Sequence, residues 1–170
     1  MYVLNIHKRS IPASAEAVGQ LLSTLATAED QMLATDKWPR MRLDQGLQPG
    51  SKGGHGPIRY VVEEYMPGRK IVFSFRRPRG FDGRHWFEIL PKGERQCEIR
   101  HTIDMCTDSL GGLQWILAIR WLHDAYIEDA FDRVEKHFLP EKNFIPRWSA
   151  WVKGLRWLMT PRRKTQLRRV

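Results

Sequence analysis

Cysteine is scarce in this sequence, and its scarcity excludes two kinds of structure. The chain of 170 residues contains only Cys97 and Cys106. Two cysteines provide no disulfide framework, and their spacing is not that of a zinc site. Nothing in the neighbouring sequence marks either thiol for the lowered pKa that a catalytic cysteine needs. We therefore expect a reducing, cytoplasmic location, and we predict no metal and no cofactor.

Long hydrophobic runs are also absent. The N-terminal segment MYVLNIHKRSIPAS has no apolar core of the kind that a signal peptide requires. The most apolar stretch, residues 110–122, is interrupted by Gln114 and Arg120, and it is shorter than the roughly 20 residues of a membrane span. The glycine-rich segment 53–56 matches neither the phosphate-binding nor the dinucleotide-binding fingerprint. We expect no signal peptide, no transmembrane helix and a plain loop at residues 48–57.

Acidic residues are almost missing from one end of the chain. Residues 140–170 contain nine Lys/Arg and one Glu, a net charge of +8, whereas residues 1–139 contain nineteen Lys/Arg and eighteen Asp/Glu, a net charge of +1. Eight of the nine net positive charges therefore reside in the tail, and the total charge does not indicate a nucleic-acid-binding domain. We predict a domain at residues 1–139 and a basic, Trp-rich amphipathic extension at residues 140–170.

The stretch Ser109–Phe138 contains no proline and has the periodicity of one long α-helix that ends before Pro140. We expect Leu117→Asp to prevent stable folding, and Asp129→Lys to change stability by less than ~0.5 kcal/mol. The reason is the expected orientation of two sets of side chains. The apolar stripe holds Leu113, Ile116, Leu117, Arg120, Leu122, Tyr126, Ala130, Phe131, Val134 and Phe138, whereas Asp124, Glu128, Asp129, Asp132 and Glu135 fall mostly on the other face.

The segments before this helix alternate in the manner of β-strands. In the first strand we expect Tyr2, Leu4 and Ile6 on the buried face. Short turns between strands imply antiparallel neighbours, and an antiparallel sheet with helices on one face is an α+β fold. Strands are predicted at residues 2–11, 40–47, 58–65, 70–77, 84–90 and 95–106, and two short helices at residues 15–25 and 27–34.

Four segments carry a resemblance to a known family. They are the opening strand that runs into IPASAEAVGQLLSTL, the turn and strand PGRKIVFSF, the hairpin around LPKGERQCEI, and the long closing helix. Together they resemble the START-related helix-grip superfamily (SRPBCC), which includes polyketide cyclase/dehydrase and lipid-transport domains. The resemblance covers residues 1–139. It implies a curved antiparallel sheet that grips the last helix around a cavity for an apolar or aromatic ligand, with no universal catalytic set.

Two histidines are the main candidates for a site inside that cavity. His85 and His101 occupy the face assigned to the interior, where a histidine can bind the polar end of a ligand or carry a proton. The alternatives are a hydrogen-bonded core histidine or a reversed face. The hairpin turn allows two registers, in which His85 lies opposite either His101 or Ile99. The candidate cavity residues are Tyr60, Glu64, Phe73, Phe75, His85, Phe87, Ile99, His101, Ile103, Leu117 and Arg120.

The C-terminal extension has tryptophans at helical steps and a basic flank. This combination is typical of a helix at a membrane interface. The segment could instead pack back on the domain or pair with another chain, and nucleic acid is the less favoured partner. We expect a chain without residues 143–170 to fold and to lose affinity for anionic vesicles. The residues assigned to this surface are Trp148, Trp151, Lys153, Arg156, Trp157, Arg162 and Arg163.

Three functional hypotheses follow. The first is binding or transport of a hydrophobic small molecule or lipid in the cavity. The second is a cyclase/dehydratase-like enzyme in which cavity His and Tyr side chains move protons. The third is an interaction protein that acts through its basic tail, on an anionic membrane or by self-association. Convergent polar groups in an enclosed cavity would favour the enzyme, an all-apolar cavity would favour the carrier, and a filled core would favour the third.

Overall fold

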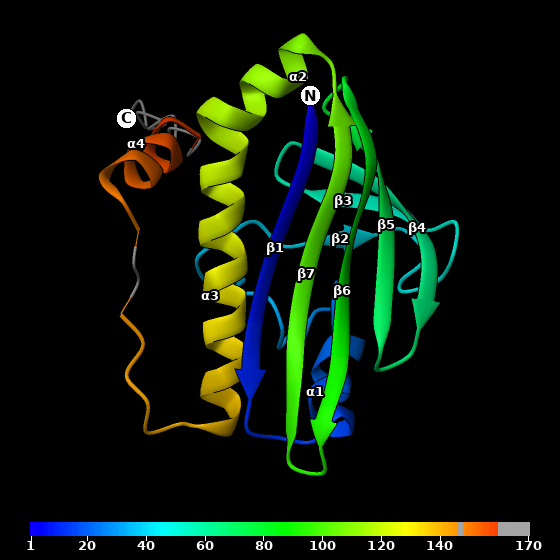
Figure 1. Cartoon of the computed structure of the whole chain (residues 1–170), viewed down its shortest axis with the longest axis vertical. Coiled ribbons are helices and arrows are strands. Elements are labelled where there is room, and N and C mark those ends of the chain that lie inside the picture. The colour runs from blue at the N-terminus through cyan, green and yellow to red at the C-terminus, as the bar shows by residue number, and fades with distance from the viewer. Residues whose placement is uncertain (146–147, 160–170) are drawn as a thin grey trace, which may run out of the picture.

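The structure, a computed structural model, describes residues 1–145 and 148–159. One antiparallel sheet with the strand order β1-β7-β6-β5-β4-β3-β2 curves away from a long helix that lies alongside β1 (Figure 1). The expected α+β architecture is confirmed. The strands are β1 Tyr2–Ile11, β2 Arg42–Leu43, β3 Lys52–His55, β4 Ile58–Met66, β5 Lys70–Arg77, β6 Phe81–Gly93 and β7 Gln96–Thr107. The helices are α1 Ala15–Ser23, α2 Ser109–Gln114, the π-helix η1 Trp115–Ile119, α3 Arg120–Phe138 and α4 Ala150–Met159.

A seventh strand forms in the glycine-rich segment for which the sequence predicted a loop. β3 pairs with both β2 and β4. A Cβ atom at Gly53 would collide with the backbone of Arg42, and one at Gly54 would collide with the backbone of Ile58. The glycines are therefore needed for close strand approach, which is one of their uses within sheets, and the loop prediction was wrong.

The second predicted short helix, at residues 27–34, is absent. The chain forms turns there, organised by the buried carboxylate of Asp30. This carboxylate accepts hydrogen bonds from the amides of Ala26 (3.2 Å), Met32 (2.9 Å) and Leu33 (2.8 Å). A short side chain that binds nearby backbone amides competes with helix formation.

The outer and inner faces of β1 are the reverse of the prediction. Tyr2, Leu4 and Ile6 are 51–62% exposed, whereas Val3 and Ile11 are buried. A one-residue change of phase moves every side chain of a strand to the other face. The inner face of β1 is therefore largely polar.

Ion pairs between β1 and α3 explain why that polar face turns inward. His7 lies between Asp124 (3.0 Å) and Glu128 (2.7 Å), and Arg9 pairs with Glu128 (2.7 Å) and Glu135 (2.7 Å). Burial lowers the pKa of His7, but its hydrogen bonds to the two carboxylates outweigh burial and raise that pKa to about 9. The acidic row predicted to face solvent thus binds the helix to the edge strand.

The long helix is continuous but contains one π turn. The amide of Arg120 donates to the carbonyl of Trp115, five residues back. This wider turn rotates the following residues relative to an α-helix. Leu117, within this turn, is 52% exposed, and the Arg120 side chain is 56% exposed and lies 3.7 Å from Asp124. Leu113 and Ile116, also predicted to face inward, are 53% and 52% exposed. The predicted inward placement of Leu117 and Arg120 was wrong.

The described part of the C-terminal extension packs against the rest of the chain. Val152 of α4 is 4% exposed and belongs to the main hydrophobic core. The indole of Trp148 donates to Asp129 at 2.9 Å, and the Arg156 guanidinium lies 4.0 Å from the Trp148 ring and 4.1 Å from the Trp38 ring. The sequence left open whether this segment binds a membrane, packs on the domain or pairs with another chain. In the structure α4 packs on the domain. The division at residue 139 stays a prediction, and Arg162 and Arg163 lie outside the described residues.

This packing changes the expected effect of truncation. Removing residues 143–170 should lower the free energy of unfolding by about 3 kcal/mol, because it uncovers the core at Val152 and removes a donor from buried Asp129. The sheet and α3 should still fold cooperatively at 25 °C. Urea unfolding of the full and truncated chains measures the difference. A chain that lacks only residues 160–170 is the control and should match the full chain; equal stability of all three would show that α4 contributes no packing.

Candidate functional site

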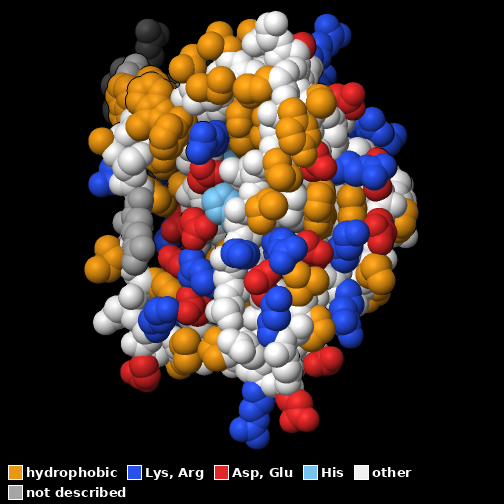
Figure 2. Space-filling view, in the orientation of Figure 1, with side chains coloured by type: hydrophobic (Ala, Val, Ile, Leu, Met, Phe, Trp, Pro, Cys, Tyr) orange, Lys and Arg blue, Asp and Glu red, His pale blue; other side chains and the backbone are white. Residues whose placement is uncertain are grey.

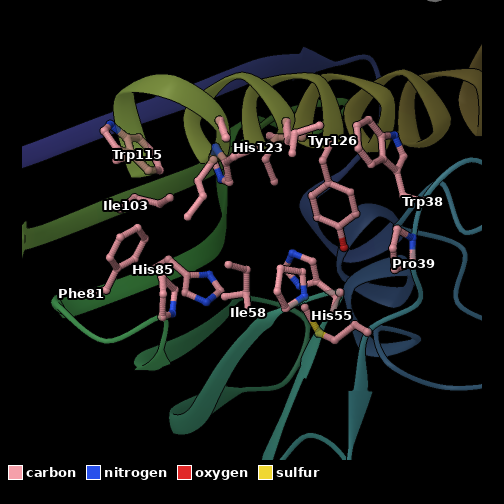
Figure 3. Close-up of a pocket in the computed structure, with 18 of the residues that line it drawn as sticks. Trp38, Pro39, His55, Ile58, Phe81, His85, Ile103, Trp115, His123 and Tyr126 are labelled. Atoms are coloured by element: carbon pink, nitrogen blue, oxygen red, sulfur yellow. The ribbon is translucent and has the colours of Figure 1, made fainter. Parts of the chain in front are cut away.

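A cavity of about 780 Å³ lies between the inner face of the sheet, the long helix and α4 (Figure 3). Apolar side chains form most of its wall, and a few polar groups interrupt them. The lining residues are Lys37, Trp38, Pro39, Met41, His55, Gly56, Pro57, Ile58, Phe75, Pro78, Phe81, His85, Phe87, His101, Ile103, Gln114, Trp115, Ala118, Ile119, Leu122, His123, Tyr126, Ile127, Arg156 and Met159.

Four histidines from four different elements meet at this cavity. His55 comes from β3, His85 from β6, His101 from β7 and His123 from α3. Figure 3 shows His55, His85 and His123 directed toward the interior together with Tyr126. Because side chains alternate between the faces of a strand, each strand histidine needs the correct phase to point inward.

His85 and His101 form a hydrogen-bonded pair. The Nδ1 atom of His85 lies 3.3 Å from the Nε2 atom of His101. The hairpin turns at residues 94–95, so that His85 lies opposite Ile103 and His101 lies opposite Phe87. Both registers considered from the sequence were wrong. The pair meets along the diagonal between neighbouring strands, which long or aromatic side chains can span.

The rings of this pair are held by aromatic neighbours. The His85 ring stacks on Phe73 with a centroid distance of 4.8 Å, and the His101 ring lies 4.4 Å from Phe87. The two histidines are 4% and 2% exposed. Their orientation is therefore set by packing, which is what a precise binding or catalytic group requires.

Several polar atoms in the cavity wall have no hydrogen-bond partner within the described residues. They are Nε2 of His85, Nδ1 of His101, Nε2 of His123 and the hydroxyl of Tyr126. Leaving a buried polar atom unpaired costs roughly 1–3 kcal/mol, and such an atom usually faces a water or a ligand. These atoms mark the part of the cavity that is suited to a polar group of a ligand.

Burial keeps these imidazoles neutral. It lowers the pKa values of His85 and His101 well below that of free histidine, and the other cavity histidines lower them further. Burial also lowers the pKa of His55 to about 4. The Nδ1 atom of His55 lies 3.1 Å from the hydroxyl of Tyr60, whose pKa burial raises. A neutral imidazole can both donate and accept a hydrogen bond.

One group in the described part of the chain has the spacing of a metal site. Ligand atoms of His7, His123 and Asp124 lie within 4.8 Å of one another. The same Asp124 oxygen already contacts both histidines, at 3.0 and 3.4 Å, and it accepts a hydrogen bond from Asn5 at 3.0 Å. Glu128 contacts the other nitrogen of His7. This arrangement is that of an ion-pair cluster whose possible ligand atoms already contact one another.

The structure brings together only part of the site assigned from the sequence. The residues in the cavity wall are Phe75, His85, Phe87, His101 and Ile103. Tyr60, Phe73 and Ile99 are buried in the core behind the wall. Glu64, Leu117 and Arg120 lie outside the cavity.

Glu64 lies outside because β4 is irregular. A register shift between Val62 and Glu64 reverses the alternation of the strand, as a β-bulge does. The Glu64 side chain is 47% exposed and lies 3.4 Å from Lys70. Tyr60 and Glu64, both predicted to line the cavity, therefore point in different directions.

Sequence reasoning missed His55, His123 and the contribution of Arg156 to the cavity. His55 lies in the segment taken for a loop. His123 lies three residues before Tyr126 on the same helix, so helical spacing could have placed it inward. Arg156 was assigned to a membrane or partner surface, but it lines the cavity and donates to the carbonyl of Lys37 at 2.6 Å.

Comparison with known proteins finds solved structures of similar fold. No protein-family model and no curated protein matches the sequence. Among solved structures, a START superfamily protein from Mycobacterium smegmatis matches with a TM-score of 0.51 and 13% identity, over 84% of this chain and 100% of its own. Norcoclaurine synthase from Thalictrum flavum, in complex with dopamine and hydroxybenzaldehyde, matches with a TM-score of 0.59 and 13% identity, over 85% and 90%.

A third structure, a protein from Nitrosospira multiformis, has a TM-score of 0.62 and 12% identity over 82% of this chain and 98% of its own. Identities of this size establish likeness of fold and not of activity. The order of the strands, the long closing helix and the cavity between them agree with this likeness. The chain therefore has the helix-grip fold of the START-related proteins.

Proposed function

We propose that the protein binds a hydrophobic small molecule or lipid in the cavity and holds its polar end against His85 and His101. The observation that carries this proposal is a largely apolar wall interrupted by imidazole nitrogens that have no hydrogen-bond partner in the part of the chain that the structure describes. The volume of about 780 Å³ falls within the usual range of small-molecule sites, roughly 300–1,000 Å³. A ligand with a long apolar part and one hydrogen-bonding group would satisfy both features.

A second candidate function is proton transfer catalysis of the cyclase/dehydratase type. The observation that favours it is the hydrogen-bonded, neutral pair of His85 and His101 in an apolar cavity. A neutral imidazole that can accept a proton and return it is the commonest general acid or base. The norcoclaurine synthase of similar fold is by name an enzyme. The same polar groups also serve the first candidate, so only conversion of the bound compound separates an enzyme from a carrier.

Transport would require the ligand to move between this cavity and another apolar phase. We include an anionic membrane surface among the proposed partners, reached from the cytoplasm, because Trp151 and Trp157 of α4 are 53% and 67% exposed. None of the helices in residues 1–145 and 148–159 has the length and apolarity needed to cross a bilayer. Any membrane contact by these helices would therefore be at the surface.

Filling the cavity should abolish binding of an apolar probe. Ala118 of η1 lines the cavity, and Ala118→Trp should lower the affinity for N-phenyl-1-naphthylamine at least about tenfold, because it replaces probe volume with protein. Fluorescence titration measures this affinity. The control is Ala28→Trp at an exposed turn, which should leave the affinity unchanged. Equal affinity in both variants and the parent would mean that the probe binds elsewhere and that the cavity proposal fails.

The chemical identity of the ligand is accessible by native mass spectrometry of the full chain purified from its own host. The proposal expects a retained mass with an apolar skeleton that the Ala118→Trp variant does not retain. Incubation of the released compound with the parent and with His85→Phe then separates the two candidates. Conversion by the parent alone supports the enzyme, and binding without conversion supports the carrier.

A further inference from the structure

An exposed apolar face lies beside the cavity, at the end of the molecule formed by α2, η1 and α4. Figure 2 shows hydrophobic side chains gathered at this end. Large exposed apolar patches on soluble proteins mark interaction sites. We define the docking face by six side chains, each 52–72% exposed: Leu113, Ile116, Leu117, Trp151, Trp157 and Leu158.

The docking face has one part on α2 and η1 and another part on α4, and the two parts are connected to each other and to the cavity. The indole of Trp151 donates to the carbonyl of Leu117 at 2.9 Å, which joins α4 to η1. The same two helices contribute Ala118 and Met159 to the cavity wall. A molecule that leaves the cavity between these helices would emerge at the docking face.

Charge indicates what covers this face. Lys153 is exposed on α4, and the Arg120 side chain is 56% exposed at the start of α3. The eleven residues after Met159 contain five Lys/Arg, no acidic residue and only two aliphatic side chains. That segment is poorly suited to covering the apolar face and well suited to an anionic surface. A symmetric dimer through this face would instead bring two sets of these cations together, which is unfavourable.

We propose that the docking face binds the surface of an anionic lipid bilayer. Tryptophan favours the boundary between headgroups and acyl chains, and the flanking cations are attracted to anionic headgroups. The apolar side chains of η1 and α4 enter that boundary while the helices lie along it. The further role of this contact, transfer of ligand between bilayer and cavity, rests on the proposed function, whereas the binding itself does not.

A matched pair of double variants tests this assignment. Ile116→Ser with Leu117→Ser removes two side chains of the docking face, both 52% exposed. Leu4→Ser with Ile6→Ser removes the same residue types at 55% and 51% exposure from the outer face of β1. Sedimentation with vesicles of phosphatidylcholine and phosphatidylserine should show at least about tenfold weaker binding for the first pair only. Vesicles of phosphatidylcholine alone should bind the parent weakly.

Three outcomes would overturn the proposal: no binding of the parent to anionic vesicles, equal losses in both double variants, or a parent dimer that the Ile116→Ser/Leu117→Ser variant dissociates. The last outcome would identify the face as a contact between copies. Probe binding to the same variants in solution separates this test from the cavity proposal. Vesicle binding without probe binding would support the docking face and reject the proposed ligand site. Probe binding without vesicle binding would reject the docking face alone.

Discussion

Replacing Asp129 with lysine is expected to lower the free energy of unfolding by about 3–5 kcal/mol, because it removes one partner of a buried charged cluster. The Asp129 carboxylate is buried. It accepts hydrogen bonds from the indoles of Trp38 at 2.7 Å and Trp148 at 2.9 Å, and it lies 3.3 Å from the Lys37 ammonium. A lysine would leave both indoles without this acceptor and would place two cations together. Urea unfolding at neutral pH measures the loss.

Leu117→Asp is the contrasting variant. The Leu117 side chain is half exposed. The substitution should therefore lower the free energy of unfolding by less than about 0.5 kcal/mol, as most surface substitutions do. Asp129→Asn serves as the control for charge, because it keeps the size and one acceptor; its cost should lie between those of the other two variants. If Leu117→Asp unfolds the protein while Asp129→Lys does not, the helix phase read from the sequence is correct and the structural assignment is wrong.

The sequence predicted a large effect for Leu117→Asp and a small one for Asp129→Lys, and the structure reverses this order. The reversal shows what periodicity can and cannot predict. The extent of the helix was predictable, because the absence of proline and the break at Pro140 are local features. The phase was not, because the π turn at Trp115–Ile119 changes the side-chain rotation within an otherwise regular pattern. Beyond that turn, Tyr126, Phe131 and Val134 are buried as predicted. Within the apolar stripe the error is therefore confined to residues 113–120. Asp129 and Glu135, predicted for the other face, are also buried, and they accept hydrogen bonds from Trp38 and Arg9.

The reversed face of β1 has a different origin. Alternation identified the strand, but it could not say which face meets the helix, because both faces carry plausible side chains. The choice depends on the acidic residues of α3, more than one hundred positions away in the chain, which pair with His7 and Arg9. Charge complementarity between distant segments is visible only once the fold brings them together.

The histidine pair was predictable in part. Alternation in two adjacent strands placed His85 and His101 on one face, and this face borders the cavity. The register depended on the turn and on the irregularity between Pro91 and Gly93, which a propensity argument does not resolve. His55 entered the site through a glycine-rich strand that the sequence had assigned as a loop, and His123 lies on the helix three residues before Tyr126, a spacing that the sequence reasoning did not use.

The histidines of the cavity predict a response of stability to pH. Their pKa values in the folded protein are lowered from about 6.5, the value expected in the unfolded chain. The contribution of each neutral histidine to the stability of the folded protein is therefore fully present above pH 6.5. It is lost as the pH falls toward the pKa of that histidine in the folded protein. For His55, with a folded pKa of about 4, the loss amounts to about 3 kcal/mol. His7 behaves oppositely: its contribution is complete below pH 6.5 and is lost between pH 6.5 and about 9.

Replacing the pair by His85→Phe with His101→Phe should therefore flatten the acid limb of the stability profile. Each of the two histidines takes up at most one proton on unfolding, so the slope should fall by up to about 2.7 kcal/mol per pH unit once the pH is well below 6.5. Urea unfolding from about pH 7 to pH 4.5 measures this slope before most carboxylates titrate. Leu4→Phe, which replaces a non-titrating side chain that is 55% exposed on the outer face of β1, is the control and should leave the slope unchanged. NMR titration of the parent provides the direct test. Two independent imidazole transitions near pH 6.5, the pKa of histidine in an unfolded chain, would show that His85 and His101 are accessible to solvent. Both residues would then be removed from the proposed site.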